Sequence, residues 1–515
     1  MQVERRAISS AVIGGLVVVI LVVAGVGGYI LSQSSASGGS TTHSQTLQSS
    51  SSLGTSSQTT SSSVETSQLP TETSSTTQLS TSAQSSSTTS SVTQITSPGV
   101  ASPACSGEDL YDPFNGLVYV TVTNASLSQF QPFPVFTDIL NGTRVIGSVP
   151  VAGPMVCNPA NGYVYIITGN LALGSSQDRL FIVSGANIIL NESSGISCGS
   201  NVVNYCNGVG GMLYDSTDQD VYIVASLNTN TVVNVVQGAN IVSDVVSWSG
   251  VGAGCMALDS SSGDVYVGAS YSSVIDILRG TSVSGSVTTG LTDCPITYDS
   301  SNGYIYVGQG PGGTSVVDGS ALIASIKAPV SCLDSHCLLF DAGNSLVYAE
   351  GYAQLNVIDG TSLVGTLNFT HSILEGMVVN QGNQYLYLTD AFTNGSTTNI
   401  DIILGTNLIT KVAVDVGTVG VDPVNGYTYM LSAPLYNGIG LTNNTLLIVS
   451  GRTIVANETL SSFNPESTTY DAANGEFYAV VQPAIWEYGS WAPTGVEVFV
   501  LNNTTLEAAL SLISS

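Results

Sequence analysis

The chain has 515 residues, and only 8% of them are charged, whereas a soluble globular protein has roughly 25%. Its net charge is −27, because 8 Lys and Arg residues face 35 Asp and Glu residues. A nucleic-acid-binding protein needs clustered Lys and Arg to neutralise phosphates. Composition therefore excludes nucleic acid as a partner.

The first element in chain order is an uncharged apolar run from Ala11 to Leu31. A helix of this length spans the roughly 30 Å of a bilayer core, and Arg5 and Arg6 before it predict that residues 1–10 stay inside the cell. We interpret 11–31 as an uncleaved signal anchor, with a cleaved secretory signal peptide as the alternative. The stretch 6–9, Arg-Ala-Ile-Ser, also resembles archaeal pilin-type signal sequences. Every version predicts a cell-membrane location with the bulk of the chain extracellular.

Residues 32–100 consist almost entirely of Ser, Thr and Gln. Such a segment has too few apolar residues to form a core, so we expect a disordered spacer. Extracellular Ser/Thr-rich tracts with scattered Pro are typical of O-glycosylated stalks, and a bare linker is the alternative.

A repeat occupies residues 101–515. In each unit an Asp or Asn lies seven residues before a Tyr, at Asp112/Tyr119, Asn158/Tyr165, Asp215/Tyr222, Asp259/Tyr266, Asp299/Tyr306, Asp341/Tyr348, Asn380/Tyr387, Asp422/Tyr429 and Asp471/Tyr478. A period near 40–45 residues with strand-like content predicts β-propeller blades.

The turns inside each unit predict four antiparallel strands. "DPxNG" favours a hairpin turn, "YVY" alternates as a strand does, and a second turn such as "VIDGTSL" (357–363) follows. We therefore predict an all-β fold, a single β-propeller of eight or nine four-stranded blades. Either all nine units join the ring, which we favour, or one divergent unit packs outside an eight-bladed ring. The repeated Tyr residues are expected to be buried between blades with bonded hydroxyls rather than catalytic.

The units resemble YVTN-type β-propeller repeats of bacterial periplasmic and archaeal cell-surface proteins. The resemblance covers the chain from about residue 104 and rests on Asp-Pro-x-Asn-Gly-x-Val-Tyr and the later Asp-Gly turn. This chain departs from the pattern in lacking Thr-Asn after its "YV" core. The resemblance implies the propeller fold, and it implies no single function, because members of the family have varied roles.

The connections predict which rim of the propeller binds. With strands A to D alternating in direction, the tight A–B and C–D turns share one rim, and the long connections 121–134, 191–211 and 481–495 lie on the other. Trp486, Tyr488 and Trp491 in the last of these are candidate ligand-binding residues, and a cap on the last blade is the alternative.

Eight cysteines in an exported chain favour disulfides. Neighbours in sequence suggest Cys105–Cys157, Cys198–Cys206, Cys255–Cys294 and Cys332–Cys337. A metal site around His336 is the alternative for the last pair, but it lacks the two-residue spacing of zinc knuckles, and we expect no metal.

Nine Asn-x-Ser/Thr sequons are candidate glycosylation sites, at Asn124, Asn141, Asn191, Asn368, Asn394, Asn443, Asn457, Asn502 and Asn503. Each is a weak signal in a chain rich in these residues. Together they suit an externally exposed glycoprotein.

Few residues could perform catalysis. The chain has three His and no nucleophile elbow, zinc-binding helix or phosphate loop, so we assign no catalytic residue and no cofactor. Asp215, Asp218 and Asp220 fit a solvated turn better than a calcium loop.

Two functions remain. The preferred one is a membrane-tethered structural, adhesion or recognition module that binds a surface glycan or another cell-surface protein. The alternative is an extracellular lyase or glycosidase with a carboxylate-based site on the loop-rich rim.

Overall fold

The computed structural model describes residues 106–107, 109–123, 135–168, 179–192, 211–227, 230–249, 254–269, 272–290, 295–331, 337–369, 372–392, 398–414, 416–432, 444–460, 463–487, 490–493 and 495–512. The predicted signal anchor (11–31) and stalk (32–100) lie outside these residues. Within the described part of the chain, no helix has both the length and the apolar character needed to span a bilayer.

Each blade takes four strands in chain order, A to D, paired as an antiparallel meander. Blades 1 to 3 are β2 (Leu110–Asp112), β3 (Leu117–Thr123), β4 (Val135–Asn141), β5 (Arg144–Val149); β6 (Met155–Asn158), β7 (Tyr163–Thr168), β8 (Arg179–Ser184), β9 (Asn187–Glu192); and β10 (Met212–Asp215), β11 (Asp220–Leu227), β12 (Asn230–Gln237), β13 (Asn240–Ser249). Blades 4 to 6 are β14 (Gly254–Asp259), β15 (Asp264–Ala269), β16 (Val274–Arg279), β17 (Ser282–Thr288); β18 (Ile296–Asp299), β19 (Tyr304–Gly308), β20 (Thr314–Asp318), β21 (Ala321–Ile326); and β22 (Leu338–Asp341), β23 (Leu346–Gly351), β24 (Gln354–Asp359), β25 (Ser362–Asn368). Blades 7 to 9 are β26 (Ser372–Asn380), β27 (Tyr385–Phe392), β28 (Thr398–Leu404), β29 (Asn407–Ala413); β30 (Val416–Asp422), β31 (Tyr427–Ser432), β32 (Asn444–Ser450), β33 (Thr453–Leu460); and β34 (Phe463–Asp471), β35 (Glu476–Glu487), β37 (Val496–Asn502), β38 (Thr505–Leu512).

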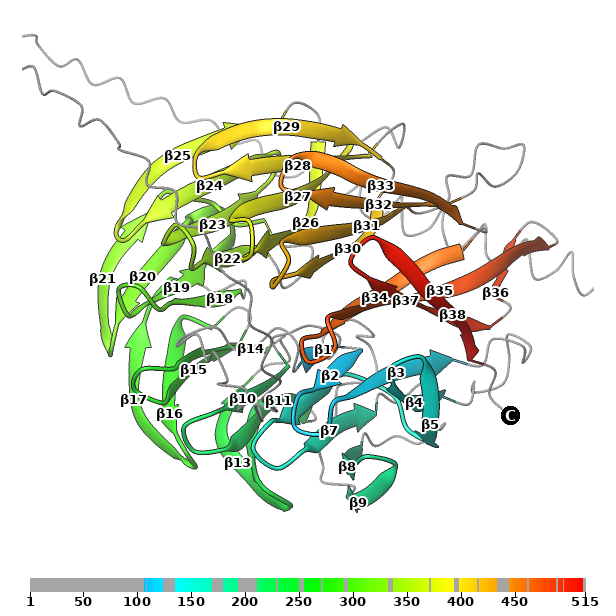
Figure 1. Ribbon diagram of the computed structural model, residues 1–515. Coiled ribbons are helices and arrows are strands. Elements are labelled where there is room, and N and C mark those ends of the chain that lie inside the picture. Colours follow the sequence, from blue (N-terminus) through cyan, green and yellow to red (C-terminus); the bar gives the residue numbers. More distant parts are fainter. Residues whose placement is uncertain are drawn as a thin grey trace, which may run out of the picture. The chain divides into compact units, whose positions relative to one another are not determined.

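The nine sheets form a closed ring, seen in Figure 1 as strands arranged around a common centre. Inner strands of successive blades contact one another all the way round, and β2 of blade 1 contacts β34 of blade 9. All nine repeats therefore join a nine-bladed propeller, as the repeat predicted.

Three elements lie outside this regular pattern. The short strand β1 (Ser106–Gly107) pairs with β6 and adds a fifth, innermost strand to blade 2. A single 3₁₀ turn, η2 (Gly310–Gly312), connects β19 to β20. In blade 9, β36 (Ser490–Pro493) pairs with the end of β35. The prediction of a long loop over 481–495 was thus wrong for most of this stretch, because β35 continues to Glu487 and folds back as a hairpin.

The Asp or Asn of each repeat is a buried hydrogen-bond acceptor for the A–B turn. In blade 1, the Asp112 carboxylate accepts the backbone N–H of Phe114 at 3.0 Å and the side-chain amide of Asn115 at 2.6 Å. All nine of these residues are at most 8% exposed. The turn needs one residue with positive φ, which is Gly in most blades, such as Gly116, and Gln219, Ser345 or Gln384 in three. Local sequence alone thus specifies this turn.

The repeated Tyr connects each blade to the next. All nine are among the largest fully buried side chains. In six blades the hydroxyl donates to a backbone carbonyl in the C–D turn of the following blade, for example Tyr306 to Gly360 at 2.9 Å and Tyr387 to Gly451 at 2.8 Å. Each hydrogen bond fixes the spacing of two sheets while the ring fills the space between them. The nine tyrosines are buried as predicted, and six of their hydroxyls bond to the next blade.

The outer strands are shaped to stack and to resist pairing with other chains. Most carry a β-bulge just after the C–D turn, as β25 does opposite Val357 and Ile358. A bulge interrupts the edge ladder that another strand would need. In β25 a glycine follows the bulge, and a Cβ added at Gly365 would lie only 2.7 Å from Thr406 Cγ2 of the next blade. Close stacking of blades 6 and 7 therefore depends on this glycine.

We predict that Tyr306→Phe lowers the free energy of unfolding by about 1 kcal/mol, because it removes the donor to a carbonyl at the blade 5–6 seam. Urea denaturation measures the change. Tyr352→Phe is the matched control, since Tyr352 is 73% exposed. An equal effect of both substitutions would contradict the role of the hydroxyl.

Candidate functional site

The two rims of the ring differ sharply in their connections. Every A–B turn has four residues, as in 113–116, and every C–D turn has two, as in 142–143. The B–C and D–A connections share the opposite rim and vary widely, from 352–353 to the stretches 124–134, 193–210 and 433–443 outside the described residues. The predicted division into a tight-turn rim and a loop-rich rim is therefore confirmed.

The ring closes between blades 1 and 9 without exchange of a strand between these two sheets. Buried side chains of both blades form one cluster that includes Val118, Val120, Val498 and Val500. The Tyr hydrogen bond is different at this seam, since Tyr478 donates to Glu476 Oε2 at 2.6 Å. The closing seam thus departs from the repeat pattern, and a pocket lies there.

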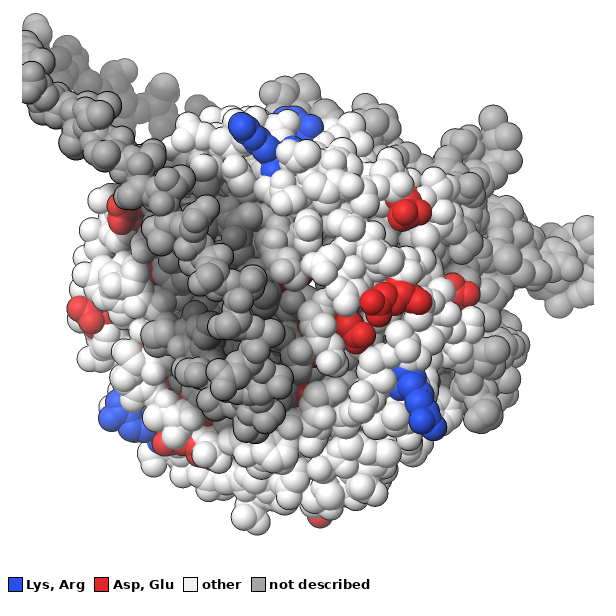
Figure 2. All heavy atoms as spheres, viewed as in Figure 1, with Lys and Arg blue, Asp and Glu red and all other residues white. Residues whose placement is uncertain are grey.

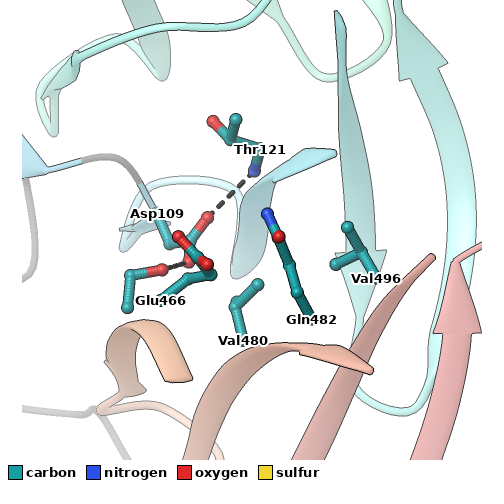
Figure 3. Close-up of a pocket in the computed structure, with 7 residues that line it drawn as sticks. Asp109, Thr121, Glu466, Val480, Gln482 and Val496 are labelled. Carbon is teal, nitrogen blue, oxygen red and sulfur yellow. Dashed lines mark hydrogen bonds between the residues drawn. The ribbon is translucent and has the colours of Figure 1, made fainter. Parts of the chain in front are cut away.

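Figure 3 shows this pocket, about 70 Å³ in volume, between β2, β3 and the strands of blade 9. Its lining residues are Asp109, Thr121, Glu466, Ser467, Val480, Gln482 and Val496. Two carboxylates, two hydroxyls and an amide give it an oxygen-rich, acidic wall. The volume suits a single polar group rather than a whole sugar ring.

Asp109 links the two blades inside this pocket. One carboxylate oxygen accepts the backbone N–H of Thr121 in blade 1 at 2.9 Å, and the other accepts the hydroxyl of Ser467 in blade 9. Asp109 is 5% exposed, so these bonds act in a largely dry environment. Glu466, in contrast, is exposed and lies at an irregularity in the register of β34.

Sequence reasoning missed this pocket. Asp109 and Ser467 are 358 positions apart, and no motif marks either one. Only closure of the ring brings them together.

The predicted aromatic site lies next to the pocket along the chain. Gln482 is followed directly by the part of β35 that pairs with β36, in which Trp486 is register partner to Trp491. Tyr488 lies outside the described residues. Directly opposed residues of an antiparallel pair have neighbouring Cβ atoms, so the backbone brings two of the three predicted residues together.

The cysteines occupy inner positions of the ring. Cys157 lies on β6, Cys255 on β14 and Cys337 directly before β22, and all three are disulfide-bonded. Cys105, Cys198, Cys206, Cys294 and Cys332 lie outside the described residues. Each predicted pair includes at least one of these five cysteines, so the four pairings stay predictions.

The sequons that the structure describes lie towards the outer edge, at the end of a third strand, in a C–D turn or on a fourth strand. Asn141, Asn191, Asn368, Asn457 and Asn503 are exposed and Asn502 is half-buried, whereas Asn124, Asn394 and Asn443 lie outside the described residues. Their positions are accessible, and their modification stays a prediction.

No group of three or more His, Cys, Asp or Glu side chains within the described ranges is arranged to hold a metal ion. The carboxylates of Asp215 and Asp220 instead serve the turn of blade 3, where they accept the N–H of Thr217 and the amide of Gln237. Burial raises the pKa of both carboxyls.

Comparisons with known proteins identify no family. No family model matches the chain, and no curated protein matches it. Solved structures with a similar fold include the dihydro-haem d1 dehydrogenase NirN in complex with DHE (12% identity, TM-score 0.42, covering 69% of this chain and 74% of that one). Others are a eukaryotic initiation factor (11%, TM-score 0.46, 69% and 88%) and the β-propeller domain of Cps50 (Swd1) from Myceliophteria thermophila (9%, TM-score 0.33, 56% and 96%). At such low scores the likeness carries no argument about function, and the YVTN type of the repeat stays a prediction.

We predict that Asp109→Ala weakens ring closure, lowering the free energy of unfolding by about 1–3 kcal/mol, because two buried donors lose their acceptor. Urea denaturation and limited proteolysis measure the change, and Asp318→Ala at an exposed C–D turn is the control. Equal protease resistance of Asp109→Ala and the parent would contradict the link.

Proposed function

We propose that this chain is a membrane-tethered extracellular propeller of YVTN type whose loop-rich rim recognises a glycan or protein partner at the cell surface. The observation that carries the proposal is the contrast between the rims: eighteen uniform short turns on one, and all the elaborated connections on the other. Binding loops carried on a rigid scaffold show this division.

The surface has few charges with which to bind. In Figure 2, Lys, Arg, Asp and Glu side chains are few and scattered on the face shown. A recognition site on such a surface would rely on aromatic stacking and neutral hydrogen bonds, which suits the Trp486–Trp491 hairpin and the adjacent polar pocket.

The alternative of an extracellular lyase or glycosidase has one observation in its favour, which is that Asp109 and Glu466 line the same pocket. Both oxygens of Asp109 already accept hydrogen bonds from the protein, so the first role of this carboxylate is to link blades 1 and 9. Hydrolysis of a polysaccharide panel that is lost in Glu466→Gln would favour the enzyme.

We predict that Trp486→Ala and Trp491→Ala each weaken partner binding at least tenfold, because aromatic residues at the centre of a binding surface contribute about 2 kcal/mol or more. Glycan arrays and cell-surface pull-downs with the full chain measure binding. Tyr352→Ala is the control, an exposed aromatic on the same rim in blade 6. Unchanged binding in both Trp variants would remove the hairpin from the proposal.

The pairing of β1 with β6 predicts a disulfide bond. The register pairs Ser106 with Val156 and Gly107 with Met155, so one further step along β1 would place Cys105 opposite Cys157, which is disulfide-bonded. We expect non-reducing peptide mapping of the full chain to recover a Cys105–Cys157 peptide. Recovery of Cys157 bonded to another cysteine would contradict it.

A further inference from the structure

Blade 7 contains two buried acids paired with one lysine, a cluster that none of its neighbours has among the described residues. Asp401 on β28 is completely buried and Asp390 on β27 is 1% exposed. The ammonium of Lys411 on β29 lies between them, and the Lys411 side chain is 42% exposed. The Nζ atom of Lys411 is 2.9 Å from Asp401 Oδ2 and 3.0 Å from Asp390 Oδ2. It also lies 5.4 Å from the ring centroid of Phe369, which follows β25.

The charges of this cluster do not balance. Two carboxylates face one ammonium, which leaves one negative charge when all three groups are ionised. The second oxygen of each carboxylate, Oδ1, is buried without a hydrogen-bond partner among the described residues. Burying an uncompensated charge costs several kcal/mol, so one bound proton would relieve the site.

The cluster lies at the seam between blades 6 and 7. Leu388 and Ile403, on the two strands that carry the acids, pack into the core cluster shared by these blades. Across the seam blade 6 presents Leu355, Val357 and Phe369. It also presents Glu350 of β23, which is 3% exposed and is the register partner of Leu355. The charged groups that shift the pKa of Asp401 are Lys411 and Asp390.

Blade 6 shows what an uncharged version of the site looks like. Asn356 and Thr366 are opposed on β24 and β25 as Asp401 and Lys411 are on β28 and β29. The Thr366 hydroxyl donates to Asn356 Oδ1 at 3.1 Å, and the Asn356 amide donates to the carbonyl of Pro329 at 3.2 Å. A neutral pair therefore satisfies this position, and blade 7 departs from it.

Burial raises the pKa of Asp401 to about 6, although Lys411 lowers it and Asp390 raises it further. The folded state thus binds this proton more tightly than the unfolded chain, in which the carboxyl keeps its ordinary pKa of 3.8. The stabilisation is fully present below pH 3.8 and is lost as the pH rises through about 6.

We propose that Asp390, Asp401 and Lys411 form a proton-operated latch between blades 6 and 7. With one proton bound, the cluster is neutral and the seam is tight; after its release, a buried negative charge weakens the seam. Asp390 lies two residues before the end of β27 and Phe369 directly after β25, so the latch sits at the loop-rich end of the seam. Acid would therefore tighten this part of the loop-rich rim.

The test compares urea unfolding of the full chain at pH 4.5 and pH 7.5. Between these values, a pKa difference from 3.8 to about 6 makes the unfolding constant rise about 25-fold through Asp401 alone. The double variant Asp401→Asn with Lys411→Thr, which copies the blade 6 pair, should lose this part of the rise. Asp318→Asn, at an exposed acid, should keep it.

Asp390→Asn provides a second route should the double variant fail to fold. It removes the neighbouring negative charge that raises the pKa of Asp401 in addition to burial, so the same part of the pH dependence should shrink. Infrared difference spectra give an independent readout: the C=O band of protonated Asp401 should appear at pH 4.5 in the parent and be missing in the double variant. A pH dependence and a carboxyl band that are the same in the parent, the double variant and Asp390→Asn would overturn the proposal.

Discussion

The ring depends on one constraint, which is that every blade must bury both of its faces against a neighbour. The repeated Tyr meets this constraint by filling the seam with its ring and donating its hydroxyl to the next C–D turn. At the blade 6–7 seam, the absence of a side chain at Gly365 lets the C–D turn of blade 7 approach the outer strand of blade 6 closely. The nine blades close the ring.

The two ends of the ring meet at the seam of blades 1 and 9 and have to be held together there. Apolar side chains of both blades pack into one cluster, and Asp109 adds hydrogen bonds to both blades. The same seam lacks the regular Tyr bond and contains the pocket. A place where the repeat has to change is also a place where new side chains can gather without disturbing the other blades. The combination of pocket and aromatic hairpin at this seam follows from that freedom.

Charge is scarce in this chain, yet many of its acids are buried within the blades. Most turn carboxylates accept backbone N–H groups and are neutralised in part by these dipoles, as Asp422 is by Val424 and Asn425. Blade 7 has instead two acids and one base beside the apolar cluster of the blade 6–7 seam. In a chain with so few bases, that arrangement couples stability to pH more directly than surface charge does.

The amino-acid sequence by itself determined the blade. Asp-Pro-x-Asn-Gly encodes a local turn, "YVY" alternates as a strand does, and the same period recurs nine times, so the fold and the contrast of rims could be predicted. Whether eight or nine units join the ring could not. The tertiary structure decided what meets across seams: Asp109 with Ser467, and Lys411 with Phe369 of the preceding connection. It also turned the expected 481–495 loop into a hairpin, because strand pairing there depends on residues that repeat nowhere else. Local hydrogen bonds are encoded in neighbouring residues, whereas contacts between distant strands depend on where closure of the ring places them.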